Sequence, residues 1–445
     1  MMLQQFMQQF MQPLVDVKSF AGNDGYESRW CIAFSGGLDS TVLLHLLKST
    51  QPNLSIFAIH VNHQISPHAH SWQQHCEEVC QQLRVPFVTE KVTVENRGNG
   101  IEDAARSARY GAFKKHLSSG DYLLTAHHAD DQAETLLLRL LRGTGSKGLA
   151  GIAVERMFDQ QKNIKLLRPL LSFTRDELLQ YANQHQLKWI DDDSNFSEKY
   201  DRNYLRLQVM PLLQSRWPEF QKKWNQTAQL CAETESLLQE MAIADLQIMD
   251  LRDERIGQSI NRSLFAGLSI PRQHNLLRYW LSIQEYSIPE QQHWQQIASQ
   301  IFSEKPDARI NLQWGNVSLR VYQDKIFALP IVLPELTLYM TERLAHPSMK
   351  LLRMDLPDIH IRTRQGGERC RPAGRNHSQT LKKCLQEFGL EPWLRDQVPL
   401  VYSGENLVAV GDLWICAEYL LNVSVDNTFN KMEEKGIELR WCQTK

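Results

Sequence analysis

The chain has 445 residues, 42% hydrophobic and 22% charged, with a formal net charge of −2, which suits a globular protein of about three domains. Bulk charge therefore indicates no nucleic-acid or membrane partner, and any nucleic-acid surface has to be local. Eight cysteines without a CxxC pair do not fit a disulfide framework or a ribbon-type zinc site. Because no signal-peptide pattern and no apolar run of about eighteen residues is found, we expect no membrane partner and a cytoplasmic location.

Residues 29 to 215 alternate short apolar segments with longer amphipathic ones. We predict strands at 29–34, 54–61, 86–92 and 121–126, and helices at 39–49, 70–83, 102–117 and 130–142. This alternation is typical of an α/β domain with a doubly wound, mostly parallel sheet. Ligands of such sheets lie beyond the carboxyl ends of the strands, so the residues that follow each strand are the candidates for chemistry.

The loop after the first predicted strand has the sequence SGGLDS at residues 35–40. Glycines allow a sharp turn and let backbone N–H groups approach a ligand, and the helix that begins at Asp39 favours a phosphate at its N-terminus. From spacing alone, an anion-binding loop and an ordinary strand–helix turn carry about equal weight. No GxxxxGK[ST] pattern is present, which excludes a Walker A loop.

Two segments between the strands also carry candidates. His60 lies at the end of the second predicted strand and His63 follows it. A zinc site is conceivable there with nearby residues, but the spacings match no common ligand pattern. Arg106 and Arg109 lie three apart on one predicted helix. They are either solvated surface residues or contacts for a phosphate or for the charge of a transition state.

A cluster of histidines and acids follows the fourth predicted strand. His127 and His128 precede Asp130, Asp131 and Glu134, whose spacings of three and four place the carboxylates on the first turns of one helix. Acids at a helix N-terminus are favourable without any catalytic role. That role does not explain the adjoining histidines, and a metal-dependent hydrolase remains a competing interpretation.

Six segments then point to one family. The loop at 35–40 resembles the SGGxDS loop of the PP-loop ATP pyrophosphatases. The series SGGLDS, IHVNH, GIEDAARSARY, TAHHADDQAETLLLRLLRGTG, RPLLSFTRDEL and DDDSNFSEKYDRNYLR, in this order, resembles the tRNA(Ile)-lysidine synthetases over roughly residues 29 to 210. The long remainder resembles their larger, multi-domain form. One departure is HVNHQIS, which lacks the Gly-Leu-Arg that many members carry after HVNH.

The resemblance implies a two-step reaction with ATP and Mg²⁺. ATP first adenylates the C2 oxygen of the wobble cytidine in the CAU anticodon of tRNA(Ile), releasing pyrophosphate. The side-chain amine of free L-lysine then displaces AMP and gives lysidine, which changes codon reading and aminoacylation identity from Met to Ile. Another PP-loop tRNA modifier, such as a thiolase, and a non-catalytic RNA-binding protein are the alternatives. The absence of a CxxC pair counts against the thiolase.

The resemblance and the residue chemistry together assign roles. The catalytic candidates are Asp39, Arg109, His127 and Asp131, and Asp39 is also a plausible partner for Mg²⁺. Lysine recognition is assigned to Asp131 and Glu134, because amines prefer carboxylate partners. The proton acceptor for the lysine amine stays open between a carboxylate and a histidine. The ATP-binding candidates are Ser35, Gly36, Gly37, Leu38, Asp39 and Ser40.

The organisation of the whole chain follows from changes in pattern. We expect an N-terminal extension at 1–28, the catalytic domain at 29–215, a helical middle domain with a linker at 216–345, and an α+β tRNA-binding domain at 346–445. Residues 346–395 hold ten Lys or Arg against five Asp or Glu, which predicts a nucleic-acid surface. The sequence leaves the oligomeric state open, a homodimer included. The tRNA-binding candidates are Arg202, Arg206, Arg369, Arg371, Lys382 and Lys383.

Overall fold

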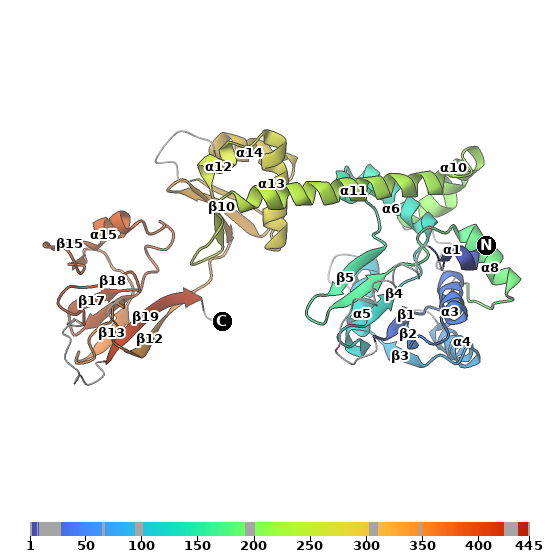
Figure 1. The fold of residues 1–445 in the computed structure, drawn as a ribbon, viewed down its shortest axis with the longest axis horizontal. Coiled ribbons are helices and arrows are strands. Elements are labelled where there is room, and N and C mark those ends of the chain that lie inside the picture. The colour runs from blue at the N-terminus through green and yellow to red at the C-terminus, as the bar shows by residue number, and fades with distance from the viewer. Residues whose placement is uncertain are drawn as a thin grey trace. The chain divides into compact units, whose positions relative to one another are not determined.

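The structure is a computed structural model that describes residues 2–6, 8, 28–64, 67–93, 101–191, 201–301, 310–346, 349–421 and 435–443. It divides into two compact units, Met1–Leu237 and Leu238–Lys445, each of which is described by itself (Figure 1). No helix within these described ranges is long and apolar enough to cross a membrane.

A six-stranded sheet forms the centre of the first unit, in the order β3-β2-β1-β4-β6-β5. Every neighbouring pair is parallel except β5 with β6, so the predicted mostly parallel sheet is confirmed. The strand order reverses between β1 and β4, which is the place where sheets of this kind bind ligands. The strands are β1 (Trp30–Ala33), β2 (Ile56–Asn62), β3 (Phe87–Lys91), β4 (Tyr122–Leu124), β5 (Glu155–Asp159) and β6 (Ile164–Leu167).

Helices cover both faces of this sheet, as predicted (Figure 1). Side chains alternate along β1, so Trp30 and Ile32 pack in the core with α3, α4 and α8, whereas Cys31 packs in the core with Phe113 of α5. The predicted strands and helices up to residue 142 agree with the structure to within two residues at each end. These helices are α3 (Leu38–Thr50), α4 (Ala69–Gln82), α5 (Ile101–His116) and α6 (Ala129–Leu141).

The remaining helices of the first unit lie at its N-terminus and after α6. The side chain of Phe6, in the predicted N-terminal extension, is fully buried in the same core as Trp30. The segment from 201 to 216 is helical throughout but includes a π-helix, a form often found at functional sites. The helices are α1 (Met2–Phe6), α7 (Ser146–Leu149), α8 (Arg175–Gln184), α9 (Asp201–Tyr204), the π-helix η3 (Leu205–Val209), α10 (Met210–Arg216) and α11 (Phe220–Gln247), within which the division into units falls.

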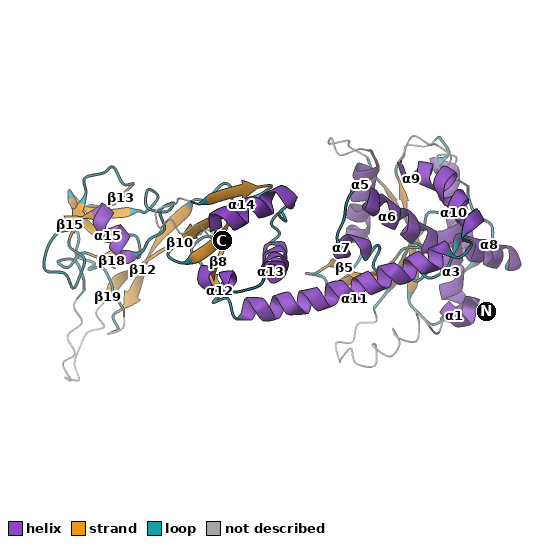
Figure 2. Cartoon of the chain, turned by 90° about the horizontal axis from the view of Figure 1, so that it is seen from above, coloured by secondary structure: helices purple, strands orange, loops and turns teal. Residues whose placement is uncertain are grey.

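The first part of the second unit combines helices with a sheet (Figure 2). The helical pattern predicted from 217 onward is present, but a five-stranded antiparallel sheet in the order β7-β8-β11-β10-β9 was missed. Its strands are too short for a clear period. Their hairpin turns are Gly315-Asn316 and the less typical Gln323-Asp324. The elements are β7 (Arg252–Asp253), β8 (Gln258–Asn261), α12 (Arg262–Ala266), α13 (Ile270–Ile283), α14 (Gln291–Ile301), β9 (Asn311–Trp314), β10 (Val317–Tyr322) and β11 (Lys325–Pro330).

The second part of this unit is α+β, as predicted, with short antiparallel strands and the helix α15. A four-stranded sheet has the order β13-β16-β17-β18, and β12 pairs with β19 and β14 with β15. The elements are β12 (Leu336–Leu344), β13 (Ile359–Arg362), β14 (Arg369–Cys370), β15 (Gln379–Thr380), α15 (Leu381–Phe388), β16 (Leu400–Ser403), β17 (Asn406–Val410), β18 (Trp414–Ile415) and β19 (Lys435–Gln443).

The loop between β1 and α3 requires glycine at one position but not at the next. Gly36 has a φ of +82°, and a Cβ there would lie 2.7 Å from Cys76 Sγ and 3.0 Å from Ile190 Cδ1. Gly37 has a φ of −74°, and its nearest neighbour to an added Cβ is Ser35 Oγ at 3.5 Å. The backbone turn therefore depends on Gly36, whereas Gly37 leaves room for a methyl group.

We expect Gly36→Ala to destabilise the first unit by about 2 kcal/mol, because the residue would be strained and would also displace its neighbours. The matched variant Gly37→Ala should change the free energy of unfolding by less than about 0.5 kcal/mol. Urea unfolding of the two purified variants measures this difference. Equal stability of the two would show that the turn does not depend on the left-handed conformation of residue 36.

Candidate active site

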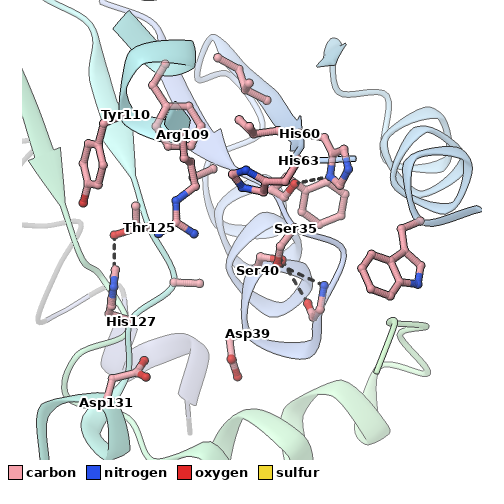
Figure 3. A pocket seen from close by; sticks show the side chains of 18 of the residues that line it. Ser35, Asp39, Ser40, His60, His63, Arg109, Tyr110, Thr125, His127 and Asp131 are labelled. Atoms are coloured by element: carbon pink, nitrogen blue, oxygen red, sulfur yellow. Dashed lines mark hydrogen bonds between the residues drawn. The ribbon is translucent and has the colours of Figure 1, made fainter. Parts of the chain in front are cut away.

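A cavity of about 440 Å³ lies at the carboxyl ends of β1, β2 and β4, beside the point where the strand order reverses (Figure 3). Ser35 and Asp39 line it from the loop after β1 and the start of α3. His63 follows β2, and Thr125 and His127 follow β4. The residues singled out by their position after a strand therefore meet in one cavity.

The wall made by the β1–α3 loop presents small polar groups and one carboxylate. The hydroxyl of Ser40 donates to the carbonyl of Gly37 at 3.1 Å and lies 3.1 Å from the hydroxyl of Ser35. Asp39 lies in the first turn of α3 and lines the cavity, and its Oδ1 is buried without a hydrogen-bond partner in the described part of the chain. A helix N-terminus and an unsatisfied carboxylate oxygen suit a phosphate with its cation.

His128 is surrounded by carboxylates. Its side chain is only 3% exposed, and Nε2 lies 3.6 Å from Asp39 Oδ2 and 3.5 Å from Asp131 Oδ2, while Nδ1 lies 3.5 Å from Asp130 Oδ2. Burial alone would lower the pKa of His128, but Asp131, Asp130 and Asp39 outweigh it and raise this pKa well above its usual value. The imidazole is therefore a buried cation.

His127, the adjacent residue, has the opposite protonation state. Its Nδ1 lies 2.9 Å from the hydroxyl of Thr125, and its ring lines the cavity (Figure 3). Burial lowers the pKa of His127 to about 4, and the positive charges of Arg168 and Arg202 act in the same direction against Asp131. At neutral pH this imidazole is therefore uncharged.

Asp131 and Glu134 form a buried ion-pair cluster with two arginines. Arg202 Nε donates to Glu134 Oε2 at 2.7 Å and Nη2 to Asp131 Oδ1 at 3.0 Å. Arg206 Nε donates to Glu134 Oε1 at 2.7 Å and Nη2 to Asp131 Oδ1 at 3.3 Å. Glu134 is 1% exposed. Although burial opposes charge, the carboxylates raise the pKa of both guanidiniums, and His128 with Arg202 lowers that of Asp131.

Comparisons with known proteins agree with this geometry. Family models described as a PP-loop domain, a TilS substrate binding domain and a TilS substrate C-terminal domain match residues 2–213, 261–327 and 359–441. The tRNA(Ile)-lysidine synthase of Coxiella burnetii is 37% identical over 436 residues, covering 93% of this chain and 92% of that protein. The chain belongs to the tRNA(Ile)-lysidine synthase family. The enzyme of that name from Shigella flexneri is 39% identical, covering 93% of this chain and 96% of its own.

Membership of this family bears out the resemblance seen in the sequence and does not favour the thiolase or the non-catalytic protein. The zinc alternative finds no support, since no group of three or more potential metal ligands is present among the described residues. Asp192 to Asn195, part of the acidic segment in the resemblance, lie outside the described residues.

In this member of the lysidine synthase family, some of the predicted site residues line the cavity and others do not. Gly36, Leu38, Glu134 and Arg206 do not line it, although Glu134 and Arg206 contact residues that do. Arg369, Arg371, Lys382 and Lys383 belong to the second unit. The predicted residues that line the cavity are Ser35, Gly37, Asp39, Ser40, Arg109, His127, Asp131 and Arg202.

Four aromatic residues of the cavity were not predicted from the sequence, and one of them, Phe34, directly follows β1. Trp72 comes from α4, and Tyr110 and Phe113 come from α5. Phe113 lies four residues after Arg109 and so shares its helix face, which was the available signal. Trp72 carried no such signal, because nothing in its local sequence separates it from an ordinary packing residue.

The opposite protonation states of the two histidines predict opposite effects of pH on stability. The folded pKa of His128 lies above its unfolded value of about 6.5, so its stabilisation is complete below that pH and is lost as the pH rises through the folded pKa. We expect His128→Gln to remove a fall in stability of up to about 1.4 kcal/mol per pH unit above pH 6.5. Urea unfolding at successive pH values measures this slope.

His127→Gln is the matched control for that measurement. Burial holds the folded pKa of His127 at about 4, so between about pH 4 and 6.5 the unfolded state binds more protons than the folded state. The free energy of unfolding therefore rises with pH over this range. The His127→Gln variant should lose this rise in stability below pH 6.5 and keep the fall in stability above pH 6.5. If both variants kept the wild-type profile, the assignment of one charged and one neutral histidine would be wrong.

Proposed function

We propose that the chain joins L-lysine to C2 of the wobble cytidine in the CAU anticodon of tRNA(Ile), converting ATP to AMP and pyrophosphate. Membership of the lysidine synthase family supports this reaction. The observation that carries the assignment to this cavity is that the loop holding Asp39 faces His127 and Asp131 across one space. A nucleotide phosphate, a nucleobase and an amine can therefore meet there.

The first step uses the wall formed by the β1–α3 loop. The C2 oxygen of the cytidine attacks the α-phosphorus of ATP, a new O–P bond forms, and pyrophosphate leaves. The backbone N–H groups at the start of α3 and the hydroxyl of Ser35 bind the leaving pyrophosphate. The unpartnered carboxylate oxygen of Asp39 fits Mg²⁺, which, when bound, neutralises charge on phosphate oxygens.

In the second step the lysine amine attacks C2 and AMP leaves. The amine has to lose a proton, because its ordinary pKa is about 10.4. His128 already carries a proton, and Asp131 is held ionised by its cationic neighbours. His127 is neutral and lines the cavity, but a pKa of about 4 makes it a weak base. We therefore assign to it only the proton that the nitrogen loses as the C–N bond forms, when that nitrogen is more acidic than the free ammonium group.

Recognition of lysine is assigned to the acidic side of the cavity. Asp131 lines the cavity and takes the ammonium group in addition to the donors that it already has from Arg202 and Arg206. Glu134 lies behind it and has to exchange its arginine partners before it can contact lysine. Arg202 also lines the cavity, which places a guanidinium where the carboxylate of free lysine needs a partner. In this arrangement Arg202 and Arg206 contact the reacting site rather than the tRNA body.

We assign the grip on the tRNA to the basic segment of the second unit. Arg369, Lys382 and Lys383 are exposed, on β14 and in the first turn of α15. Arg371 is half-buried and pairs with Glu418 at 2.9 Å. Exposed cations of this kind contact phosphates and contribute affinity without sequence selectivity.

Mass analysis of the nucleosides of the tRNA product tests the proposed function. Incubation of tRNA(Ile) with the protein, ATP and isotopically labelled lysine should convert the wobble cytidine to labelled lysidine. A product that carries sulfur instead would identify a thiolase. Unmodified RNA, with no tRNA-dependent release of pyrophosphate, would identify a binding protein and reject the proposal.

Asp39→Ala should abolish turnover in the same assay and leave tRNA binding within about twofold, because the carboxylate serves the nucleotide rather than the RNA. Asp176→Ala, which removes an exposed acid at the start of α8, is the matched control and should keep full activity. Turnover by the Asp39 variant at the wild-type rate would refute the assignment of the loop.

Replacing Arg371, Lys382 and Lys383 together by Gln should weaken tRNA binding and reduce its salt dependence by roughly one unit of slope per lost phosphate contact. Binding isotherms at several salt concentrations measure both quantities. Lys435→Gln, on an exposed position of β19, serves as the control. An unchanged slope in the triple variant would place the tRNA surface elsewhere.

A further inference from the structure

Three arginines gather around Tyr110 at the edge of the active-site cavity, and the reaction as assigned uses none of them. Arg106 and Arg156 lie over the Tyr110 ring, with their guanidinium carbons 5.3 and 5.6 Å from its centroid. Phe158 stacks on the same ring with centroids 5.5 Å apart. Arg168 follows β6 directly and contributes to the field at Tyr110. We call Arg106, Arg156 and Arg168 the arginine cluster.

The positive charge of the arginine cluster has no carboxylate partner in the described part of the chain, in contrast to Arg202 and Arg206. Arg168 is only 4% exposed. Its Nη1 donates to the carbonyl of Ala153 at 2.6 Å, and its Nε is buried without a hydrogen-bond partner. A buried guanidinium is costly unless an anion compensates it. The cluster is therefore built to face negative charge from outside the chain.

The pKa values of Arg168 and Tyr110 agree with an excess of positive charge in this region. Burial, and then the charge of Arg156, lowers the pKa of Arg168 to about 10. Burial alone would raise the pKa of Tyr110, yet the surrounding arginines lower it. Both effects are those of a region where like charges accumulate, and both would be relieved by a bound anion.

The position of the arginine cluster indicates which kind of anion can reach it. Tyr110 lines the cavity beside Arg109, on the side away from Ser35, Ser40 and Asp39 (Figure 3). The nucleotide phosphates are assigned to that other wall. Arg106 and Arg156 are exposed, so their guanidiniums are accessible to a polymer whose nucleotide enters the cavity.

We propose that Arg106 and Arg156, held on the Tyr110 ring above the buried Arg168, bind a phosphodiester of the RNA substrate next to the nucleotide that is modified. This inference rests on the proposed function and deepens it. Arginine binds phosphate oxygens through two parallel N–H groups, which positions the backbone as well as attracting it. The contact fixes how far the cytidine enters the cavity, in the way that phosphate contacts set register in other complexes.

Binding of an anticodon stem-loop RNA to Arg106→Gln and Arg156→Gln tests this site. Each variant should raise the Kd about tenfold, and the double variant Arg106→Gln/Arg156→Gln should lower the salt slope by about 0.7, the value for one phosphate contact to a single strand. Arg156→Lys should bind between the wild type and Arg156→Gln, because it keeps the charge and loses the paired donors. Arg142→Gln, an exposed arginine just after the far end of α6, should leave the Kd unchanged.

A second probe locates the phosphate. Stem-loop RNAs with one neutral methylphosphonate linkage, placed in turn on each side of the cytidine, should bind the wild type less tightly at one position. The double variant Arg106→Gln/Arg156→Gln should show no further loss at that position. Additive losses at every linkage would overturn the proposal, as would a Kd for Arg106→Gln and Arg156→Gln equal to that of the wild type.

Steady-state kinetics separates the RNA backbone from the other source of phosphate, ATP. The variants should keep the KM for ATP and the inhibition constant of inorganic pyrophosphate within about twofold. A rise in either with unchanged RNA binding would assign the cluster to the nucleotide and reject the proposal. Because the binding measurements need no turnover, they stay decisive even if nucleoside analysis rejects the proposed function.

Discussion

The buried cation at His128 is the interaction on which the site depends. Its ring holds Asp39 of α3 together with Asp130 and Asp131 of α6, and Asp130 in turn accepts a hydrogen bond from the backbone of Arg175 at the start of α8. Without that charge, three carboxylates would face one another in a poorly solvated space. The protonated imidazole therefore joins the β1–α3 loop to the acidic helix α6, and the geometry of the cavity wall follows from it.

The same arrangement separates acid from base within a few residues. His127 and His128 are adjacent, yet the first lies beside the hydroxyl of Thr125 and is neutral, and the second lies among carboxylates and is charged. Environment rather than residue type sets each role. The first step of the proposed reaction needs a stabilised anion, and the second needs a proton acceptor. Because the two histidines differ in charge, both steps can use one cavity without a large rearrangement.

The sequence was most informative where chemistry follows a strand. The loop at 35–40 and the segment from His127 to Glu134 could be placed at one sheet edge, because carboxyl ends of parallel strands meet there. The pairing of Glu134 with Arg202 and Arg206 could not be predicted, since about 70 residues separate the partners and either charge alone reads as a solvated helix face. The sheet formed by β7 to β11 escaped prediction because strands of two to six residues carry almost no periodic signal.

Arginine serves two different purposes in the first unit, and the difference lies in its partners. Arg202 and Arg206 are neutralised by Asp131 and Glu134. They hold these carboxylates of α6 in place and add little positive charge to the cavity. Arg156 and Arg168 keep their charge, because the described chain supplies no carboxylate to either. A net charge of −2 for the whole chain thus hides a local excess of positive charge at one wall of the cavity. A local excess of positive charge attracts a polyanion to this wall. It does not make the rest of the surface bind the polyanion non-specifically.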